Sequence, residues 1–203
     1  MKIYILDKVL EYNNDKSIID SMFQEIDAIL EKSKYFFSHL VIDDIEVYED
    51  YRDYFIDNVK NIREVKVISS TKKELVENIL LTSIEYLNRA IPEIDILSSE
   101  FYKNPTEQSW SKFSDLIEGI TWIMDSFVAI DTNERLKDIV SSYEEWNHYA
   151  KDIFSLQELL RGLEEVIKNQ DIVSMADMLS YEINPLFKVM KGKLKKLAFK
   201  EAN

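Results

Sequence analysis

Glu145 and His148 form the pattern in this sequence that is closest to a metal site, because they lie three residues apart on an expected helix. Di-iron carboxylate bundles use that spacing, but they require two such pairs and two further glutamates. The other histidine, His39, has no such partner, and a helical wheel turns His148 away from the apolar stripe. We therefore expect a surface histidine, no metal ligands and no cofactor.

Two carboxylates, Glu118 and Glu182, lie beside apolar residues in the expected helices. Burial would raise the pKa of such a carboxyl group and make acid–base chemistry possible. Positions at the edge of an apolar face usually let the charged group reach water, so exposed side chains are expected. We predict no catalytic residue and favour a protein that is not an enzyme. A carboxylate-based enzyme in the bundle, with or without a metal, is the alternative.

Trp122 points most directly to a binding surface. It lies on the polar side of an expected helix, with Glu118 and Asp125 around it. A large aromatic side chain in that position is either covered by another part of the chain or available to a partner. We predict Trp122, Glu118 and Asp125 as partner-binding residues; coverage by the first region of the chain or by a fifth helical segment is the other interpretation.

Residues 43–57 combine seven acids and one arginine with three tyrosines. Tyr48 and Tyr51 are therefore added to the predicted partner-binding residues. The other interpretation is that the tyrosines pack inward while the acids form a solvated face. Such a segment could also imitate a nucleic-acid backbone, which gives a second alternative function.

Composition excludes several classes of protein. The three glycines are more than twenty residues apart, so no phosphate-binding loop or nucleophile elbow can be built from them. No cysteine is present, which excludes disulfides and thiolate sites. The net charge of −13 disfavours direct nucleic-acid binding. Because no apolar run reaches the ~18 residues of a membrane span and no export signal is seen, we expect a cytoplasmic protein.

The C-terminal segment 186–200 reverses the charge of the rest of the chain. Residues 188–203 hold six lysines and one acid, and Leu186, Met190, Leu194 and Leu197 share one face. Such a helix could lie on a membrane surface or in a groove of a partner. We favour the end of the last bundle helix, because the apolar stripe continues that of Met175 and Leu179.

The elements that position these residues fall into two predicted domains. Residues 1–69 alternate short β-rich and helical stretches in the order β-α-β-β-α-β, which is that of a ferredoxin-like split unit, with a hairpin turn at Asp43-Asp44. Residues 70–203 show helical spacing throughout. The predicted class is α+β: a small α/β unit followed by an antiparallel bundle of about four long helices.

The two central helices carry the clearest seam, over residues 75–130. The first helix is expected to start in a capping box of Ser70 or Thr71 with Glu74 and to continue through Pro92. The second is expected to be capped by Asn104, with Pro105 at its first position. The predicted seam residues repeat at steps of four and three: Val76, Leu80, Ser83, Leu87, Ala90, Ile94, Leu97 and Phe101, then Trp110, Phe113, Ile117, Ile120, Met124 and Phe127.

The remaining helices are less sharply bounded. The third is predicted to begin near Asp131-Thr132 and to run through Leu136, Ile139, Tyr143, Trp146, Ala150 and Ile153. A second helix start at Ser155 is the alternative, so residues 133–168 form one helix or two. Asn169-Gln170-Asp171 should turn and cap the last helix, which should kink at Pro185.

Two segments resemble those of uncharacterised bacterial proteins. They read Tyr86-Leu87-Asn88-Arg89-Ala90-Ile91-Pro92-Glu93 and Leu116-Ile117-Glu118-Gly119-Ile120-Thr121-Trp122. Neither is a catalytic motif, and the resemblance implies a small bacterial protein with no assigned activity. The leading hypothesis is a non-enzymatic interaction protein, adaptor or chaperone-like, with a protein partner. Self-association as a homo-oligomer is a further expectation.

Overall fold

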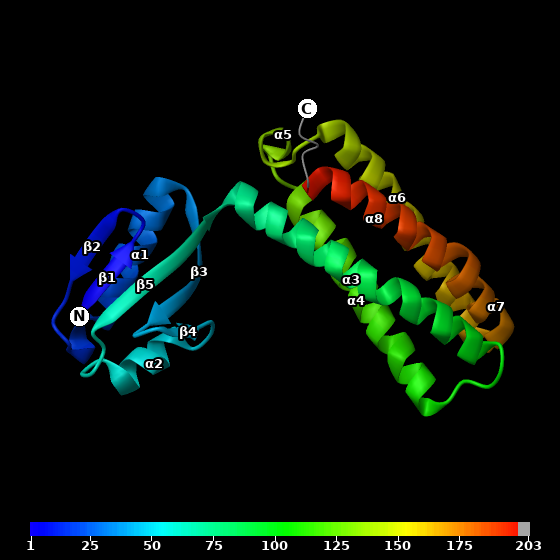
Figure 1. Cartoon of the computed structure of the whole chain (residues 1–203), viewed down its shortest axis with the longest axis horizontal. Coiled ribbons are helices and arrows are strands. Elements are labelled where there is room, and N and C mark those ends of the chain that lie inside the picture. Colours follow the sequence, from blue (N-terminus) through cyan, green and yellow to red (C-terminus); the bar gives the residue numbers. More distant parts are fainter. Residues whose placement is uncertain (199–203) are drawn as a thin grey trace. The chain divides into compact units, whose positions relative to one another are not determined.

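The computed structural model describes residues 1–198 (Figure 1). The chain divides into two compact units, Met1–Leu75 and Val76–Asn203. The first unit carries a mixed sheet and the second is helical, so the predicted α+β class is confirmed.

The first unit is built on a five-stranded sheet in the order β2-β1-β5-β3-β4. Its β1 and β5 strands are parallel, and the other neighbours are antiparallel. The strands are β1 Lys2–Ile5, β2 Lys8–Glu11, β3 Tyr35–Ile42, β4 Ile45–Val47 and β5 Glu64–Thr71. The helices are η1 Lys16–Ile18, α1 Ile19–Ser33 and α2 Tyr51–Asn58.

This pairing differs from the ferredoxin-like split unit that the order of elements suggested. In a split unit the strands on either side of the first helix run parallel, with another strand between them. Here β1 and β3 lie on either side of β5 and run in opposite directions. The first β-rich stretch is also a hairpin of two strands, β1 and β2, rather than one strand.

The predicted hairpin turn at Asp43-Asp44 is confirmed. Both residues have a positive φ, 46° and 67°, which is the backbone of a type I′ turn. Asp43 also fixes the turn to the neighbouring strand, because its carboxylate accepts hydrogen bonds from the backbone N–H groups of Arg63 and Glu64. The alternating side chains of β1, β3 and β5 then bury one face of the sheet against α1 and α2.

The second unit is the antiparallel bundle. Figure 1 shows α3, α4, α6 and the α7–α8 helix running alternately in opposite directions. The elements are α3 Lys72–Phe101, α4 Glu107–Asp131, α5 Leu136–Ile139, α6 Tyr143–Lys168, α7 Ile172–Asp177, the π-helical segment η2 Met178–Ile183 and α8 Asn184–Ala198.

Helix α3 follows the prediction closely. The Thr71 hydroxyl accepts from the Glu74 N–H while the Glu74 carboxylate accepts from the Thr71 N–H, so the capping box is confirmed. Pro92 lies inside the continuous helix. All eight predicted seam residues, from Val76 to Phe101, are buried.

Helix α4 differs from the prediction in its cap and in its seam. Thr106, not Asn104, is the N-cap, because the hydroxyls of Thr106 and Ser109 each accept from the backbone N–H of the other residue. Its buried face includes Leu116, Ile123 and Ile130. Trp110, predicted in the seam, is 39% exposed and packs edge-on against Phe101 and Phe113.

Residues 133–168 form two helices, α5 and α6. The break between them lies between Ile139 and Tyr143 and not at the predicted Ser155. The helix expected from Asp131 ends with the short α5, and Ser142 caps α6 by accepting from the Glu145 N–H. Ser155 lies inside α6, where its hydroxyl donates to the Lys151 carbonyl. The buried stripe of α6 runs through Trp146, Tyr149 and Ile153, whereas Tyr143 is 44% exposed.

The last helix is continuous but not uniform. Asp171 caps it, as predicted, by accepting from the Ser174 N–H. The disturbance expected at Pro185 lies in the turn before it, where the Asn184 N–H donates to the Leu179 carbonyl five residues back. Phe187, Met190, Leu194 and Leu197 are buried in the bundle, so the apolar stripe is core. Lys200, at the end of the predicted basic segment, lies outside the described residues.

Candidate functional site

A groove between α3 and α4 is the best-formed concave feature of the helical unit. Its volume is about 320 Å³. Five lining residues are apolar or aromatic and four are charged: Tyr86, Ala90, Ile94, Leu97 and Leu116, then Arg89, Glu93, Lys112 and Asp115. All nine come from α3 and α4, and the apolar residues Ala90, Ile94, Leu97 and Leu116 are at most 8% exposed.

Helical spacing explains the composition of the groove. Ala90, Ile94 and Leu97 are buried seam residues of α3, and Leu116 is their counterpart on α4, so they form an apolar floor. Arg89 and Glu93 are one turn apart on α3, at the edge of the same stripe. The small side chain of Ala90 leaves space between the helices that a larger residue would fill.

Tyr86 closes one end of the groove because Gly119 gives it room. A Cβ atom at Gly119 would overlap the hydroxyl and ring of Tyr86. The Tyr86 hydroxyl donates to the Leu116 carbonyl at 3.4 Å, and the ring lies 6.4 Å from the rings of Trp122 and Phe187. Burial raises the pKa of Tyr86 to about 12.

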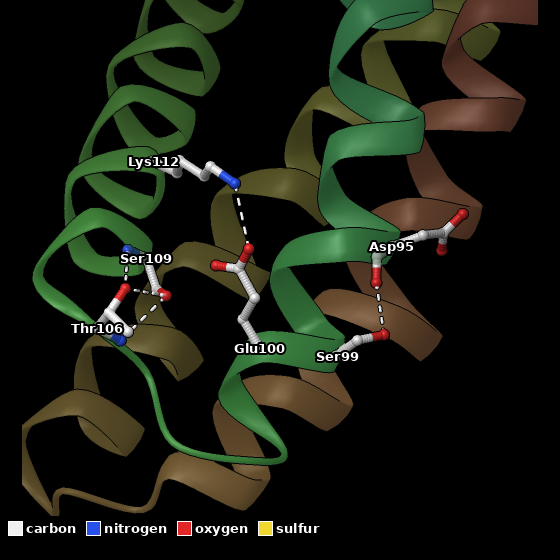
Figure 2. A network of polar contacts seen from close by, with 6 residues as sticks. All are labelled: Asp95, Ser99, Glu100, Thr106, Ser109 and Lys112. Carbon is white, nitrogen blue, oxygen red and sulfur yellow. Dashed lines mark hydrogen bonds and ion pairs between the residues drawn. The ribbon is translucent and has the colours of Figure 1, made fainter.

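The other end of the groove carries an ion pair between the helices. Lys112 Nζ lies 3.1 Å from Glu100 Oε1 (Figure 2). A hydrogen bond from the Ser109 hydroxyl, followed by the Lys112 ammonium, holds the pKa of Glu100 below its usual value. Ser109 also belongs to the Thr106 cap, so the start of α4 and the end of α3 are joined by one polar network.

The three residues predicted on α4 lie just beyond Tyr86. Trp122 is 39% exposed, and Glu118 and Asp125 are exposed on either side of it. Asp115, which lines the groove, is seven residues before Trp122 and therefore on the same face of the helix. Trp122 therefore lies beyond the end of the groove that Tyr86 closes, with acids around it.

Tyr48 and Tyr51 belong to the other unit. Tyr48 is 58% exposed and stacks on His39 with the ring centroids 4.5 Å apart. Tyr51 is half-buried, packs edge-on against Phe37 and donates to the Tyr48 carbonyl. The tyrosine pair therefore forms a separate candidate surface from that of Trp122.

The acids predicted to be exposed are exposed. Glu118 and Glu182 both face solvent, as does His148. Within residues 1–198, no group of three or more His, Cys, Asp or Glu side chains is arranged to hold a metal ion. In the same range, no helix is long and apolar enough to cross a membrane.

A second polar site lies between α6 and α8. Asp152 is 8% exposed and accepts from Lys193 Nζ at 2.7 Å, while its second carboxylate oxygen is buried without a hydrogen-bond partner among residues 1–198. Lys193 also donates to the His148 carbonyl. Burial, with Asp152 nearby, raises the pKa of Tyr149. The pair joins the two helices.

Asn184 makes a comparable contact between α8 and α3. Its side-chain amide is fully buried and donates to the Ile91 carbonyl and to Asp95 Oδ1, at 2.9 and 2.7 Å. Asn184 Oδ1 has no partner. The contact joins the residue before Pro185 to the residue before Pro92, so it braces both proline positions.

The sequence missed the groove residues Tyr86, Arg89, Glu93, Lys112 and Asp115. One signal could have indicated them: a glycine in the middle of a strongly periodic helix usually has a packing reason. Gly119 is such a residue, and the large side chain it admits is Tyr86.

Two sequence-family models match parts of the chain. The family described as "TP0873 N-terminal domain" matches residues 1–71, and neither it nor the second family has a description that names an activity. No curated protein and no solved structure matches the chain. The second family matches residues 78–193, more than half of the chain, and this range includes both segments on which the resemblance was based. The chain therefore belongs to the family described as "Domain of unknown function (DUF8042)".

Proposed function

We propose that this protein is a non-enzymatic interaction module, an adaptor or chaperone-like protein, that binds a protein partner along the α3–α4 groove and over Trp122. The observation that carries the proposal is the groove of about 320 Å³ between two helices, which has the buried apolar residues Ala90, Ile94, Leu97 and Leu116 at its floor and charged side chains at its border. Grooves of this form accept the apolar face of a partner helix. The exposed aromatic residue at its end is of the type that dominates binding energies.

The exposure of the acids supports this proposal over the carboxylate enzyme. A general acid or base needs a pKa shifted by burial or by a specific partner, and Glu118 and Glu182 lie in solvent. The acidic-mimic alternative is supported only by net charge, because the acids of unit 1 are interspersed with Lys2 and Lys66 on strands β1 and β5.

Two finer expectations belong to the same proposal. We place the protein in the cytoplasm, on the ground that it has no cysteine. We also propose that it self-associates, because Val173 and Tyr181 are 59% and 70% exposed on the helical unit. Light scattering of the purified full chain at two concentrations tests the second point; a monomer at both concentrations contradicts it.

Site-specific photo-crosslinking tests the binding surface. A photoreactive amino acid is placed at Asp115 or at Trp122, and in a control at Phe154, which is 61% exposed on α6. The proposal predicts that Asp115 and Trp122 give the same discrete crosslinked partner in cells that express the protein, and that Phe154 does not.

A pattern that is equal at all three positions would show unspecific contact and contradict the proposal. The loss of all crosslinks at Asp115 and Trp122, with a defined product at Phe154, would move the binding surface to α6. The variants change exposed residues, so circular dichroism should give the same helical content for each.

A further inference from the structure

The charges beside the groove are unevenly paired. Glu93 and Asp115 line it, and Glu118 and Asp125 flank Trp122. Within residues 1–198, none of these four carboxylates forms an ion pair, whereas Lys112 is occupied by Glu100. Arg89 is the one rim cation without an ion pair in the same range. The unpaired charges at this surface are therefore four acids and one base.

Trp122 is placed to receive a cation rather than an anion. Glu118 lies one turn before it, Asp125 one turn after it and Asp115 two turns before it, all on one side of α4. No lysine or arginine of residues 1–198 lies over the Trp122 ring, although such contacts occur elsewhere in the chain, as with Arg52 over Phe23. An indole face surrounded by carboxylates attracts an ammonium or guanidinium group through both its quadrupole and their charge.

The apolar floor sets a second requirement on the same ligand. A volume of about 320 Å³ lined by Ile94, Leu97 and Leu116 has room for a few large side chains. A purely cationic, hydrated ligand would leave this surface in water. The occupant must therefore present apolar side chains and positive charges about one or two helical turns apart.

We propose that the α3–α4 groove binds a basic amphipathic helix of a partner protein, which inserts apolar side chains into the groove beside Tyr86 and above Ile94, Leu97 and Leu116, and places its lysines or arginines at Asp115, Glu118, Asp125 and Trp122. This inference rests on the proposed function and names the chemistry of the partner. Charge complementarity decides between helical partners, because an acidic amphipathic helix would meet four unpaired carboxylates.

Fluorescence anisotropy with model peptides tests the inference on the purified full chain. The probe is a labelled helical peptide of about 18 residues, with leucines at i, i+3, i+4 and i+7 and lysines elsewhere. One comparison peptide replaces the lysines by glutamates, and another replaces the leucines by serines. We expect the basic amphipathic peptide to bind at least about tenfold more tightly than either.

Two variants of equal net charge separate this surface from the general acidity of the protein. Asp115→Asn with Glu118→Gln should weaken binding of the basic peptide by about five- to tenfold. Glu144→Gln with Glu165→Gln removes the same charge from exposed positions on α6 and should change binding by less than about twofold. Trp122→Ala should weaken binding about fivefold without altering the helical content.

Equal binding of the lysine and glutamate peptides, or equal weakening by both double variants, would overturn the inference. Undiminished binding of the serine peptide would overturn it too, because the apolar floor would then be unused. If the crosslinks at Asp115 and Trp122 persist while the basic peptide shows no preference, the chemistry is wrong and the interaction module remains. If those crosslinks are absent, the proposed function itself fails.

Discussion

The α6–α8 and α3–α4 seams of the helical unit differ in how many of their charged residues form ion pairs. Between α6 and α8, Asp152 and Glu145 pair with Lys193 and Lys196. Between α3 and α4, a groove remains open, and of the charges beside it only Lys112 is paired.

The difference explains how a strongly acidic chain uses its basic C-terminal helix. Two α8 lysines form ion pairs with acids of α6. The charges of this seam are therefore paired within the helical unit. Within residues 1–198, no lysine-rich helix forms ion pairs with α4. Its acids Asp115, Glu118 and Asp125 are exposed to solvent. A basic helix from a partner could supply there what α8 supplies to α6.

The largest expected effect is a difference in the free energy of unfolding between variants of Trp146 on α6 and of Trp122 on α4. Trp146 is fully buried, stacks on Phe127 at 5.1 Å and donates to Asp131. Trp146→Ala should lower the free energy of unfolding by about 3–5 kcal/mol, because it leaves a cavity. Trp122→Ala should lower it by no more than about 1 kcal/mol. Urea unfolding measures both, and equal losses would show that Trp122 is a core residue.

The second-largest effect should be the difference in stability lost when the ion pair of each seam is broken. Lys193→Met leaves the buried Asp152 carboxylate without a partner and should cost about 2–3 kcal/mol. Lys112→Met breaks a pair whose side chains are about one-third exposed, and should cost about 0.5–1 kcal/mol. Thermal and urea unfolding compare the two variants. A larger loss for Lys112→Met would contradict the description of the α6–α8 seam as the closed one.

Gly119 and Gly192, two of the three glycines that lie in helices, sharpen the comparison further. Gly119→Ala places a methyl group in the position of the Tyr86 ring and should destabilise the protein by about 1–2 kcal/mol, despite alanine's better helix propensity. Gly192→Ala, on the exposed face of α8, meets no neighbouring atom and should stabilise it by about 0.5–1 kcal/mol. In the Gly119→Ala background, Tyr86→Leu should recover part of the loss, and additive losses would count against the contact.

The smallest effect concerns pH. A tyrosine in the unfolded chain ionises near pH 10, whereas folded Tyr86 keeps its proton to about 12. The unfolded state therefore binds fewer protons between these pH values, and stability falls as the pH rises through this window. Tyr86→Phe should lose less stability than the wild type between pH 10 and 12, and equally little below pH 10. An identical decline in both proteins would show that Tyr86 is not protected by burial.

The sequence predicted the face of each helix better than the space between helices. The α3 seam was predicted in full, because its leucines and isoleucines repeat without interruption. The α4 seam was wrongly phased at its start because Trp110 and Phe113 are both large and apolar. Both rings contact Phe101, and only burial distinguishes them, since Phe113 is 6% and Trp110 39% exposed. The cap at Thr106 was missed because it depends on a reciprocal pair of hydroxyls, while Asn104-Pro105 offered a stronger local signal.

The candidate site was predicted in part for the same reason. Trp122, Glu118 and Asp125 were placed on the outer side of α4 from periodicity alone, and the structure leaves them exposed. Arg89, Glu93 and Asp115 look like ordinary surface charges in the sequence. They line a groove because of how α3 and α4 pack together at Ala90 and Gly119. The spacing of residues along one helix does not predict that packing.

Methyl NMR of the full chain, titrated with the basic amphipathic peptide, tests the central claim most directly. We predict that the methyl signals of Ile94, Leu97 and Leu116 shift as the peptide saturates the protein, while those of Leu163 and Leu194 in the α6–α8 seam stay unchanged. Shifts at Leu163 and Leu194 without shifts at the groove methyls would contradict the claim that the open α3–α4 seam is the binding surface.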